Sequence, residues 1–464
     1  MGKKESNGVY IGRDGYLLQK FTPPADSDLK KKAEALNSLA RMAPGVHTYV
    51  MLAPTALSVL TEKVPHYVAG EKMLEEMAKV REQLQDVSFI DVYPALHTRR
   101  NEEIYYRTDH HWTMRGAFYA YRELGKQMGF VPKEVNDFTI RQVSNAFYGT
   151  QYSASGYKFV QPDSVNLFLP KVPDDYMVEY TAEKQTSASL YNFEYLSKKD
   201  KYALFMNGNH ALVKIKTGSH EKRKLLVVKD SYANSLVPFL TPHFSEIFVV
   251  DPRYYEEDIR KLLEDNQIHD MLVLYNLHTF FEDESLNRMV GPVEKEGVNT
   301  MLNNLTNKSL KGALLILLLA GLCIAAGCSG KGKSEVIPVD EIGKRIEQSV
   351  NLDNLKKGDL EKVQKLYGLE AEVVEDVILY TASSNVKADE IAVIRLKEEG
   401  KADYVKQRLL KRIDEQTVKF KDYRPDEYVL INKHVLKVKG STVLFAVSKD
   451  ARLIERAFDE ALGK

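Results

Sequence analysis

The stretch Tyr105–Tyr121, YYRTDHHWTMRGAFYAY, decides how the front part of this chain folds. It sets an acid, two histidines and the only tryptophan side by side, just after a short β-like run, Ile104–Tyr106. Small and aromatic residues follow from Thr113 and predict a helix. The segment Asp109–Trp112 therefore stands at the end of a strand. A metal site, a catalytic dyad and a well-satisfied structural turn could each account for it.

Around this stretch, β-like runs alternate with helical stretches over residues 8–290. Alternation at this spacing predicts a parallel sheet with helices on both faces. The predicted strands are His47–Leu52, Ser88–Val92, Lys224–Val228, Ser245–Val250 and Met271–Tyr275, and the helices between them include Asp28–Met42, Gly70–Leu84, Thr113–Met128 and Glu256–Leu263.

Composition limits the partners and sites that this chain can have. A length of 464 residues favours two or three domains. Basic and acidic residues balance at 65 each, so the whole-chain charge indicates no nucleic-acid partner. The only cysteines, Cys323 and Cys328, share one apolar segment, so neither globular region can hold an internal disulfide or a cysteine zinc site. We expect no cofactor and no metal.

The apolar segment within residues 301–335 resembles a signal sequence. Gly312–Gly327 carries no charge, which is short for a membrane span but suits a signal-peptide core. The small residues Ala325–Gly327 before Cys328, and a polar tether after it, resemble a bacterial lipoprotein signal with its lipid-accepting cysteine. An uncleaved membrane anchor is the alternative.

Such a signal belongs at an N-terminus, so the chain resembles two proteins joined end to end. We expect two neighbouring genes, the first without its own start, with a domain at 8–290 and a compact α+β domain at 336–464. The rear domain shows no polar cluster at catalytic spacing, which favours a binding or scaffolding module. Its predicted helices are Asp340–Val350, Asp359–Tyr367, Ala402–Glu415 and Ala451–Leu462, and its strands are Val377–Thr381, Glu390–Leu396, Tyr428–Asn432 and Thr442–Ser448.

Asp109 and His111 are two residues apart, so an extended segment would turn them to the same side. A carboxylate there could orient the imidazole and leave its other nitrogen free to accept a proton. The nucleophile for such a base could be Ser231, which follows the apolar strand Lys224–Val228 and precedes a predicted helix. Its own N–H could help to hold an oxyanion. Asp230-Ser231 would also make an ordinary helix N-cap.

At this point a resemblance becomes specific. Thr108–Thr113, TDHHWT, resembles the signature of the DHHW protein family, which is similar to the alginate O-acetylation proteins with their SGNH-hydrolase-like fold. Those proteins carry an Asp-x-His-Trp element, matched by Asp109 and His111, and later a serine after a strand, matched by Ser231. The resemblance covers about residues 8–285 and implies an SGNH-like α/β fold. Supporting segments are VYIGRDGYL, LAPT, YGTQYSASG, FMNGNH and VVDPRYY. Residues 336–464 more loosely resemble a lipoprotein domain of unknown function from Gram-positive anaerobes.

Two further residues are candidates for the site. The resemblance implies that Asn209 could donate its amide to an oxyanion, although Asn-Gly beside it is equally a turn signal. Tyr232 is one of several tyrosines that could stack on sugar rings.

The function predicted first is an extracytoplasmic serine O-acetyltransferase or esterase that acts on a cell-surface or secreted polysaccharide. Its acyl donor would be a membrane-bound O-acyltransferase partner, and both halves of the chain would lie at the outer face of the cell membrane. A non-catalytic glycan-binding or assembly module is the second hypothesis. A metal-dependent phosphoesterase is the third. The sequence has no His-x-Asp element ahead of Asp109, and its Asp-x-Asp, Asp26-Ser27-Asp28, opens a predicted helix instead of following a strand, as a two-metal centre would need.

Overall fold

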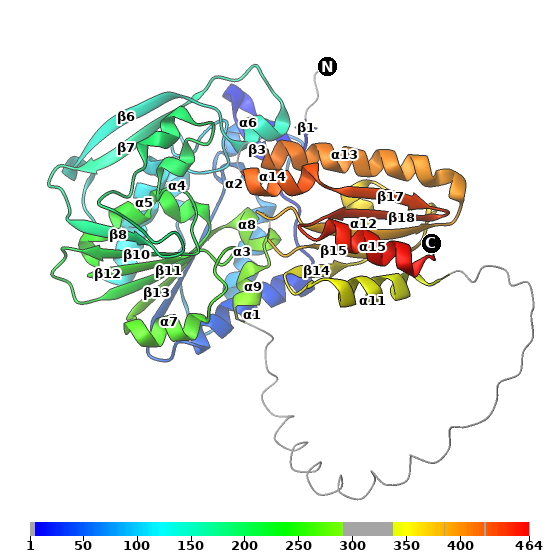
Figure 1. Ribbon diagram of the computed structural model, residues 1–464. Helices are drawn as coiled ribbons and strands as arrows, with labels where there is room; N and C mark the ends of the chain where they lie inside the picture. Colours follow the sequence, from blue (N-terminus) through cyan, green and yellow to red (C-terminus); the bar gives the residue numbers. More distant parts are fainter. Residues whose placement is uncertain (1–4, 291–336, 385, 422–423, 464) are drawn as a thin grey trace, which may run out of the picture.

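The computed structural model describes residues 5–290, 337–384, 386–421 and 424–463 (Figure 1). The predicted segment 301–335, with Cys328 in it, falls in the gap between the first two ranges, so the lipidation of Cys328 stays a prediction. Within the described ranges, no helix has both the length and the apolar character needed to cross a membrane.

The front domain is built on an eight-stranded sheet, and its centre is parallel as predicted. Parallel pairing joins the first five strands in the order β5-β4-β13-β11-β12, and antiparallel pairing adds β10, β8 and β9 on one side. The strands are β5 (Ser88–Phe89), β4 (His47–Ala53), β13 (Asp270–Asn276), β11 (Lys224–Lys229), β12 (Glu246–Val250), β10 (Leu212–Thr217), β8 (Tyr176–Tyr180) and β9 (Gln185–Ser187).

The sheet is therefore mixed, which corrects the prediction of a purely parallel sheet. The sequence carries the physical reason. β11 reads KLLVVK, a continuous apolar run that is buried on both faces, whereas β10 reads LVKIKT and alternates apolar with polar residues. That alternation is typical of an antiparallel strand with one face toward water.

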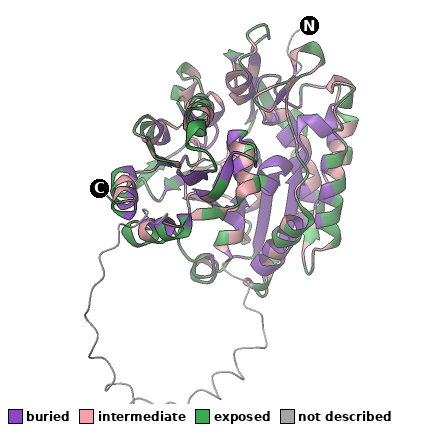
Figure 2. Ribbon diagram, turned by 90° about the vertical axis from the view of Figure 1, so that its right-hand side faces the viewer, coloured by how far each residue is buried: buried purple, intermediate pink, exposed green. Residues whose placement is uncertain are grey.

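Helices cover both faces of this sheet, as predicted. Along β11, Leu225 and Val227 join one hydrophobic core, while Leu226 and Val228 join the other, because successive side chains point to opposite faces. The first core includes α5 (Met114–Met128), and the second includes α1 (Asp26–Arg41), α3 (Lys72–Glu82) and α7 (Ile259–Asn266). Figure 2 shows the central strands buried between the helical layers.

Smaller elements frame the carboxyl edge of the sheet. A three-stranded sheet near the N-terminus contains a tight turn at Arg13–Gly15, and a long two-stranded ribbon carries a short helix between its strands. These elements are β1 (Glu5–Ser6), β2 (Val9–Ile11), β3 (Leu17–Gln19), β6 (Phe138–Phe147), α6 (Thr150–Ser155) and β7 (Asp163–Pro170); short helices are α2 (Ala56–Val59), α4 (Tyr93–Thr98), α8 (Leu277–Glu282) and α9 (Ser285–Met289).

The C-terminal domain is α+β, as predicted. Its antiparallel sheet has the order β14-β15-β16-β18-β17, with helices packed on both faces. The strands are β14 (Leu355–Gly358), β15 (Val374–Ala382), β16 (Glu390–Leu396), β18 (Thr442–Val447) and β17 (Val435–Lys439); α11 (Val339–Ser349) and α15 (Ala451–Ala461) cover one face, and α12 (Leu360–Tyr367) and α13 (Ala402–Phe420) the other.

One predicted element of this domain was wrong. Tyr428–Asn432 was predicted as a strand, but it belongs to helix α14 (Pro425–Asn432). A short apolar run is ambiguous between the two structures. The residues before it decide the outcome, because a proline at the first helical positions and the acidic first-turn residues Asp426 and Glu427 both favour a helix start.

Candidate active site

Ser231 lies at the carboxyl end of β11, where the parallel strands of the sheet terminate. The preceding residue, Asp230, is buried, and its carboxylate accepts hydrogen bonds from the backbone N–H of Tyr232 at 2.9 Å and from the N–H and side-chain amide of Asn276 on β13. Asp230 is thus the N-cap of the 3₁₀ turn Ser231–Ser235, and the predicted helix there is a series of such turns. The cap holds Ser231 at the edge of the sheet.

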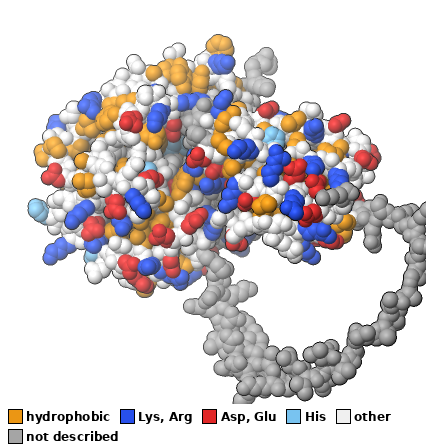
Figure 3. Space-filling model, viewed as in Figure 1, with side chains coloured by type: hydrophobic (Ala, Val, Ile, Leu, Met, Phe, Trp, Pro, Cys, Tyr) orange, Lys and Arg blue, Asp and Glu red, His pale blue; other side chains and the backbone are white. Residues whose placement is uncertain are grey.

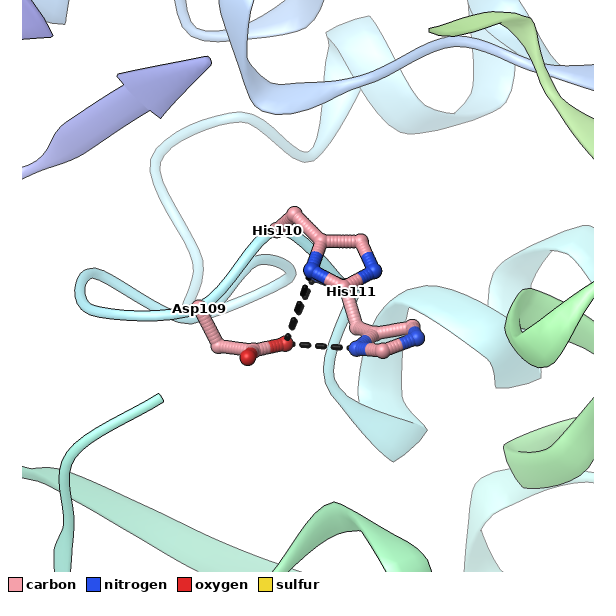
Figure 4. A group of neighbouring side chains, drawn as sticks. All are labelled: Asp109, His110 and His111. Atoms are coloured by element: carbon pink, nitrogen blue, oxygen red, sulfur yellow. Dashed lines mark hydrogen bonds and ion pairs between the residues drawn. The ribbon is translucent and has the colours of Figure 1, made fainter. Parts of the chain in front are cut away.

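His111 connects Ser231 to Asp109. Its Nδ1 lies 2.5 Å from Asp109 Oδ1, and its Nε2 lies 2.7 Å from Ser231 Oγ. Asp109 can only accept when ionised, so Nδ1 carries the proton and Nε2 is left to accept the serine O–H. The three predicted residues are therefore brought into one hydrogen-bonded chain across 120 residues of sequence. Figure 4 shows one carboxylate oxygen of Asp109 facing both imidazoles.

Asp109 is fixed by α6, which comes from the β6–β7 ribbon. Its Oδ2 accepts the backbone N–H of Thr150 at 2.8 Å and the Thr150 hydroxyl at 2.9 Å. Gly149, immediately before this helix, lies so close that a Cβ there would collide with Asp109. Sequence reasoning had noted the segment YGTQYSASG without giving these two residues a role.

The turn that carries the dyad is held by a second buried carboxylate. Asp163, at the start of β7, accepts the N–H groups of Arg107 and Thr108, each at 2.8 Å, and the Thr108 hydroxyl at 2.5 Å. Burial raises the pKa of Asp163, but its three donors oppose that shift. The backbone just before Asp109 is therefore fixed from the ribbon side. Asp163 was missed at the sequence level because nothing local marks its contact with residues more than fifty positions earlier.

The surroundings of the site shift the pKa values of Asp109 and Asp200 in opposite directions. Burial by itself would raise the pKa of Asp109, but the imidazoles of His111 and His110 and the donated hydrogen bonds hold it well below its usual range. Asp109 is therefore ionised at neutral pH. Burial raises the pKa of Asp200, which lies nearby, to about 6, and the charge on Asp109 adds to that shift.

His110 has a different environment from its neighbour. Its Nδ1 lies 2.6 Å from the Thr150 hydroxyl, and burial together with the adjacent His111 lowers its pKa to about 3. The His110 imidazole is therefore neutral across the physiological range and has no direct bond to Ser231 in the described structure. The His110 side chain therefore contacts helix α6, through Thr150, and not Ser231.

Asn209 lies where an amide donor could face the serine. Its Oδ1 accepts hydrogen bonds from Lys229 Nζ at 2.8 Å and from Asn234 Nδ2 at 3.1 Å. Two donors on Oδ1 fix the orientation of the amide, so the N–H₂ group is left for the pocket that Asn209 lines together with Ser231. The preceding turn is confirmed as well, since Met206, Asn207 and Gly208 all have positive φ.

The Lys229 ammonium that orients Asn209 belongs to a buried ion cluster. It lies 3.2 Å from Asp251, and Asp251 also accepts two hydrogen bonds from the guanidinium of Arg253. Burial lowers the pKa of Lys229, which the carboxylate of Asp251 opposes. The VVDPRYY segment contains this acid and this arginine, so its contribution is to the support of Asn209.

Tyr232 occupies a supporting position rather than a binding one. Its side chain is fully buried, and its hydroxyl donates to the carbonyl oxygen of His110. Its own carbonyl oxygen accepts Trp112 Nε1–H at 2.9 Å. The ring that stacks on His111 is that of Tyr202, with centroids 3.6 Å apart and planes 9° apart. The Tyr202 ring therefore packs flat against one face of the His111 imidazole.

Asp109, His110 and His111 are also the one group of potential metal ligands found among the described residues. Their donor atoms lie within 4.8 Å of one another. However, Asp109 Oδ1 and His111 Nδ1 are 2.5 Å apart and bonded to each other, and Thr150 already occupies Asp109 Oδ2. A metal would have to displace these bonds. A two-metal centre would need more carboxylates and histidines than this group supplies.

The candidate catalytic residues open into one pocket of about 910 Å³. Asp109, His111, Asn209 and Ser231 lie on its wall, and Tyr232 does not. The wall also includes residues of the C-terminal domain, from helix α13 and the loop after it. This volume is large enough for a ligand of several rings.

Comparison with known proteins agrees with the family assignment. Residues 11–250 match the family model described as "DHHW protein", and the chain belongs to that family. Residues 348–448 match the model of a domain of unknown function, DUF4358. No functionally curated protein matches the sequence.

Solved structures resemble the front part of the chain. A DHHW family protein from Eubacterium siraeum is 27% identical, with a TM-score of 0.55, and the match covers 61% of this chain and 95% of that one. PatB1 of Bacillus cereus, solved with a sulfonyl adduct, is 20% identical, with a TM-score of 0.53 and coverage of 61% and 98%. These matches confirm the α/β fold of the front domain.

Proposed function

We propose that this DHHW family member is an extracytoplasmic serine O-acetyltransferase or esterase that acts on a cell-surface or secreted polysaccharide. The observation that carries the proposal is the continuous chain from Asp109 through His111 to Ser231 Oγ. A neutral imidazole that accepts a serine proton, with an ionised carboxylate behind it, is the arrangement that activates a serine for acyl transfer. The resemblance of TDHHWT to the alginate O-acetylation proteins supports the same chemistry.

In the proposed reaction, Ser231 Oγ attacks the acetyl carbonyl of the donor while its proton moves to His111 Nε2. The oxyanion of the tetrahedral intermediate accepts hydrogen bonds from Asn209 Nδ2 and from the Ser231 backbone N–H. The donor oxygen then leaves with the proton from His111, and Ser231 carries the acetyl group. A sugar hydroxyl takes that group in the transferase, and water takes it in the esterase. Asp109 stabilises the imidazolium at each stage.

A serine-directed fluorophosphonate, applied with and without a chelator, separates the candidate functions. The proposal expects labelling of Ser231 in a peptide map, with no effect of the chelator on labelling or on aryl acetate turnover. A metal-dependent phosphoesterase would lose phosphoester turnover with the chelator. A glycan-binding or assembly module would remain unlabelled. An unlabelled Ser231 in a protein that turns over aryl acetates would contradict the assignment of the nucleophile.

For the cellular setting we propose the outer face of the cell membrane, with Cys328 lipidated and a membrane-bound O-acyltransferase as the acyl donor. Polysaccharide acceptors lie outside the membrane, and the sequence before Cys328 resembles a lipoprotein signal. Mass spectrometry of the native membrane fraction tests this setting. A mature species that begins at diacylated Cys328 is expected. An intact chain whose residues 1–300 are protected from external protease would contradict it.

A further inference from the structure

The two domains contact each other beside the pocket that contains Ser231. Lys356 on β14 lies 2.9 Å from Glu284, and the backbone N–H of Glu284 donates to the carbonyl oxygen of Ser383 at 3.1 Å. Arg288 donates to Asn354 at 3.0 Å. The contacts on the front domain therefore come from the segment around α8 and α9, directly after β13.

A second set of contacts lies on the other side of the pocket. The Arg424 guanidinium stacks over the ring of Tyr254, 5.0 Å from its centroid, and donates to the Tyr254 hydroxyl. Helix α13 packs beside α6, the helix whose Thr150 holds Asp109. Figure 1 shows α13 next to α6 at the junction of the two domains. Helix α13 thus lies beside the element that fixes Asp109, and the residue that contacts Tyr254, Arg424, follows its C-terminal end.

Between these contacts, side chains of α13 form part of the pocket wall. Arg412, Gln416 and Lys419 line the same space as Asp109, His111 and Ser231. Their spacing of three and four residues puts them on one face of the helix. The pocket is therefore bounded by both domains, and neither domain encloses it alone.

On the α13 wall and on the front-domain wall of the pocket, some polar side chains are paired with other side chains and some are not. Arg412 is paired with Glu390 at 2.7 Å, and Gln416 donates to the same carboxylate. Lys419, in contrast, has no carboxylate within 4.0 Å and no hydrogen-bond acceptor in the described part of the chain. On the front wall, the Asp200 carboxyl accepts backbone N–H groups and has no cation within that distance among the described residues. One wall thus supplies a donor and the other an acceptor.

We infer that the C-terminal domain is part of the acyl-transfer site, and that the carbohydrate acceptor binds between α13 and the Ser231 wall with Lys419 and Asp200 contacting its hydroxyl groups. This inference rests on the proposed function. A sugar chain offers both donors and acceptors along its length, which matches opposed walls of opposite hydrogen-bonding character. Helix α13 would then select the carbohydrate acceptor, and the front domain would form and transfer the acetyl group on Ser231.

The contact between the two domains also limits the membrane topology of the chain. Docking requires both domains on the same side of the membrane, and a segment between them that crossed the membrane once would separate them. The contacts at this junction are polar, because they join Lys356 to Glu284 and Arg424 to Tyr254. The outward face of the C-terminal domain in Figure 3 carries interspersed positive and negative side chains. Cleavage before Cys328 would leave two chains that meet at this interface.

The test uses the full chain, an aryl acetate as donor and cellopentaose as the probe acceptor. The measured quantity is the partition of acetyl-Ser231 between the pentasaccharide and water. Lys419→Ala is expected to lower this partition about fivefold to tenfold, because a charged donor to the acceptor is lost. Lys406→Ala, an exposed lysine on the same helix outside the pocket, is the matched control and should retain the wild-type partition. An unchanged partition in Lys419→Ala overturns the inference.

A second arm measures docking without any catalysis. Lys356→Glu combined with Arg424→Ala should raise hydrogen exchange in α6 and α13 together, whereas Lys357→Glu, the next residue along β14, should not. Exchange at α6 that stays at the wild-type level in a double variant whose domains have separated in small-angle scattering overturns the inference. A wild type that forms no acetyl-Ser231 refutes the proposed function instead, and the exchange arm then decides whether α13 covers the pocket.

Discussion

Gly149→Ala should disable the site while leaving the fold in place. Gly149 has φ −86°, a conformation open to any residue, so backbone freedom is not the reason for glycine at this position. The reason is proximity, because an added Cβ would lie 2.7 Å from Asp109 Cα and closer still to the Asp109 side chain. Carbon atoms normally approach to about 3.5–4.0 Å, so relief requires a shift of about 1 Å.

A shift that moves Asp109 away from His111 would lower the activity. The bond between Asp109 and His111 is 2.5 Å long, and lengthening it by about 1 Å takes it to the limit of hydrogen bonding. His111 then loses its fixed tautomer and its stabilised imidazolium. A displacement of that size at a reacting group lowers kcat by about 10²-fold. Overpacking should also lower the free energy of unfolding by about 1–3 kcal/mol.

The assay is steady-state aryl acetate turnover, together with urea unfolding of the same preparations. Gly156→Ala is the matched control at the other end of α6. Gly156 has φ +70° and nothing within 4 Å of its added Cβ, so alanine there should cost about 1–2 kcal/mol of stability through the left-handed backbone and leave kcat close to wild type. A folded Gly149→Ala protein with wild-type kcat would refute the reasoning that Asp109 must stay in place.

Four further substitutions test the site. Ser231→Ala should lower aryl acetate turnover by at least about 10³-fold without unfolding the protein, and His110→Ala should have a much smaller effect, which steady-state kinetics and circular dichroism will compare. Asn209→Ala should lower kcat by about 10²-fold through loss of an oxyanion donor, and an unchanged kcat would remove Asn209 from that role. Asp200→Asn should stabilise the protein at pH 7.5 by about 2 kcal/mol, because the folded pKa of about 6 lies above the unfolded value and ionisation therefore opposes folding as pH rises through that window. In urea unfolding, the stabilisation by Asp200→Asn should disappear below about pH 4, where the Asp200 carboxyl is protonated in both the folded and the unfolded state. A stabilisation that does not depend on pH would contradict the raised pKa of Asp200.

The sequence by itself predicted the parallel strands of the front domain, most of the longer helices and the three residues Asp109, His111 and Ser231 that the fold brings together. Continuous apolar runs such as that of β11 can only be buried on both faces, and Asp109-x-His111 is a local pattern whose spacing alone sets the two side chains together. The placement of Ser231 followed from a general rule, that the carboxyl ends of parallel strands share one edge. The prediction of a strand at 428–432 was wrong, because the pattern of a short apolar run does not separate a short helix from a short strand.

Only the tertiary structure decided how those groups are held and what encloses them. Thr150 and Gly149 reach Asp109 from 41 and 40 positions away, and Lys229 orients Asn209 from a different strand end. These contacts depend on side chains that meet after long loops close, and no local pattern encodes them. The same holds for α13, whose amphipathic sequence predicts only that one face is buried. That its Lys419 shares a pocket with Ser231 follows from the docking of one folded domain on another, which is a property of two surfaces rather than of either sequence segment.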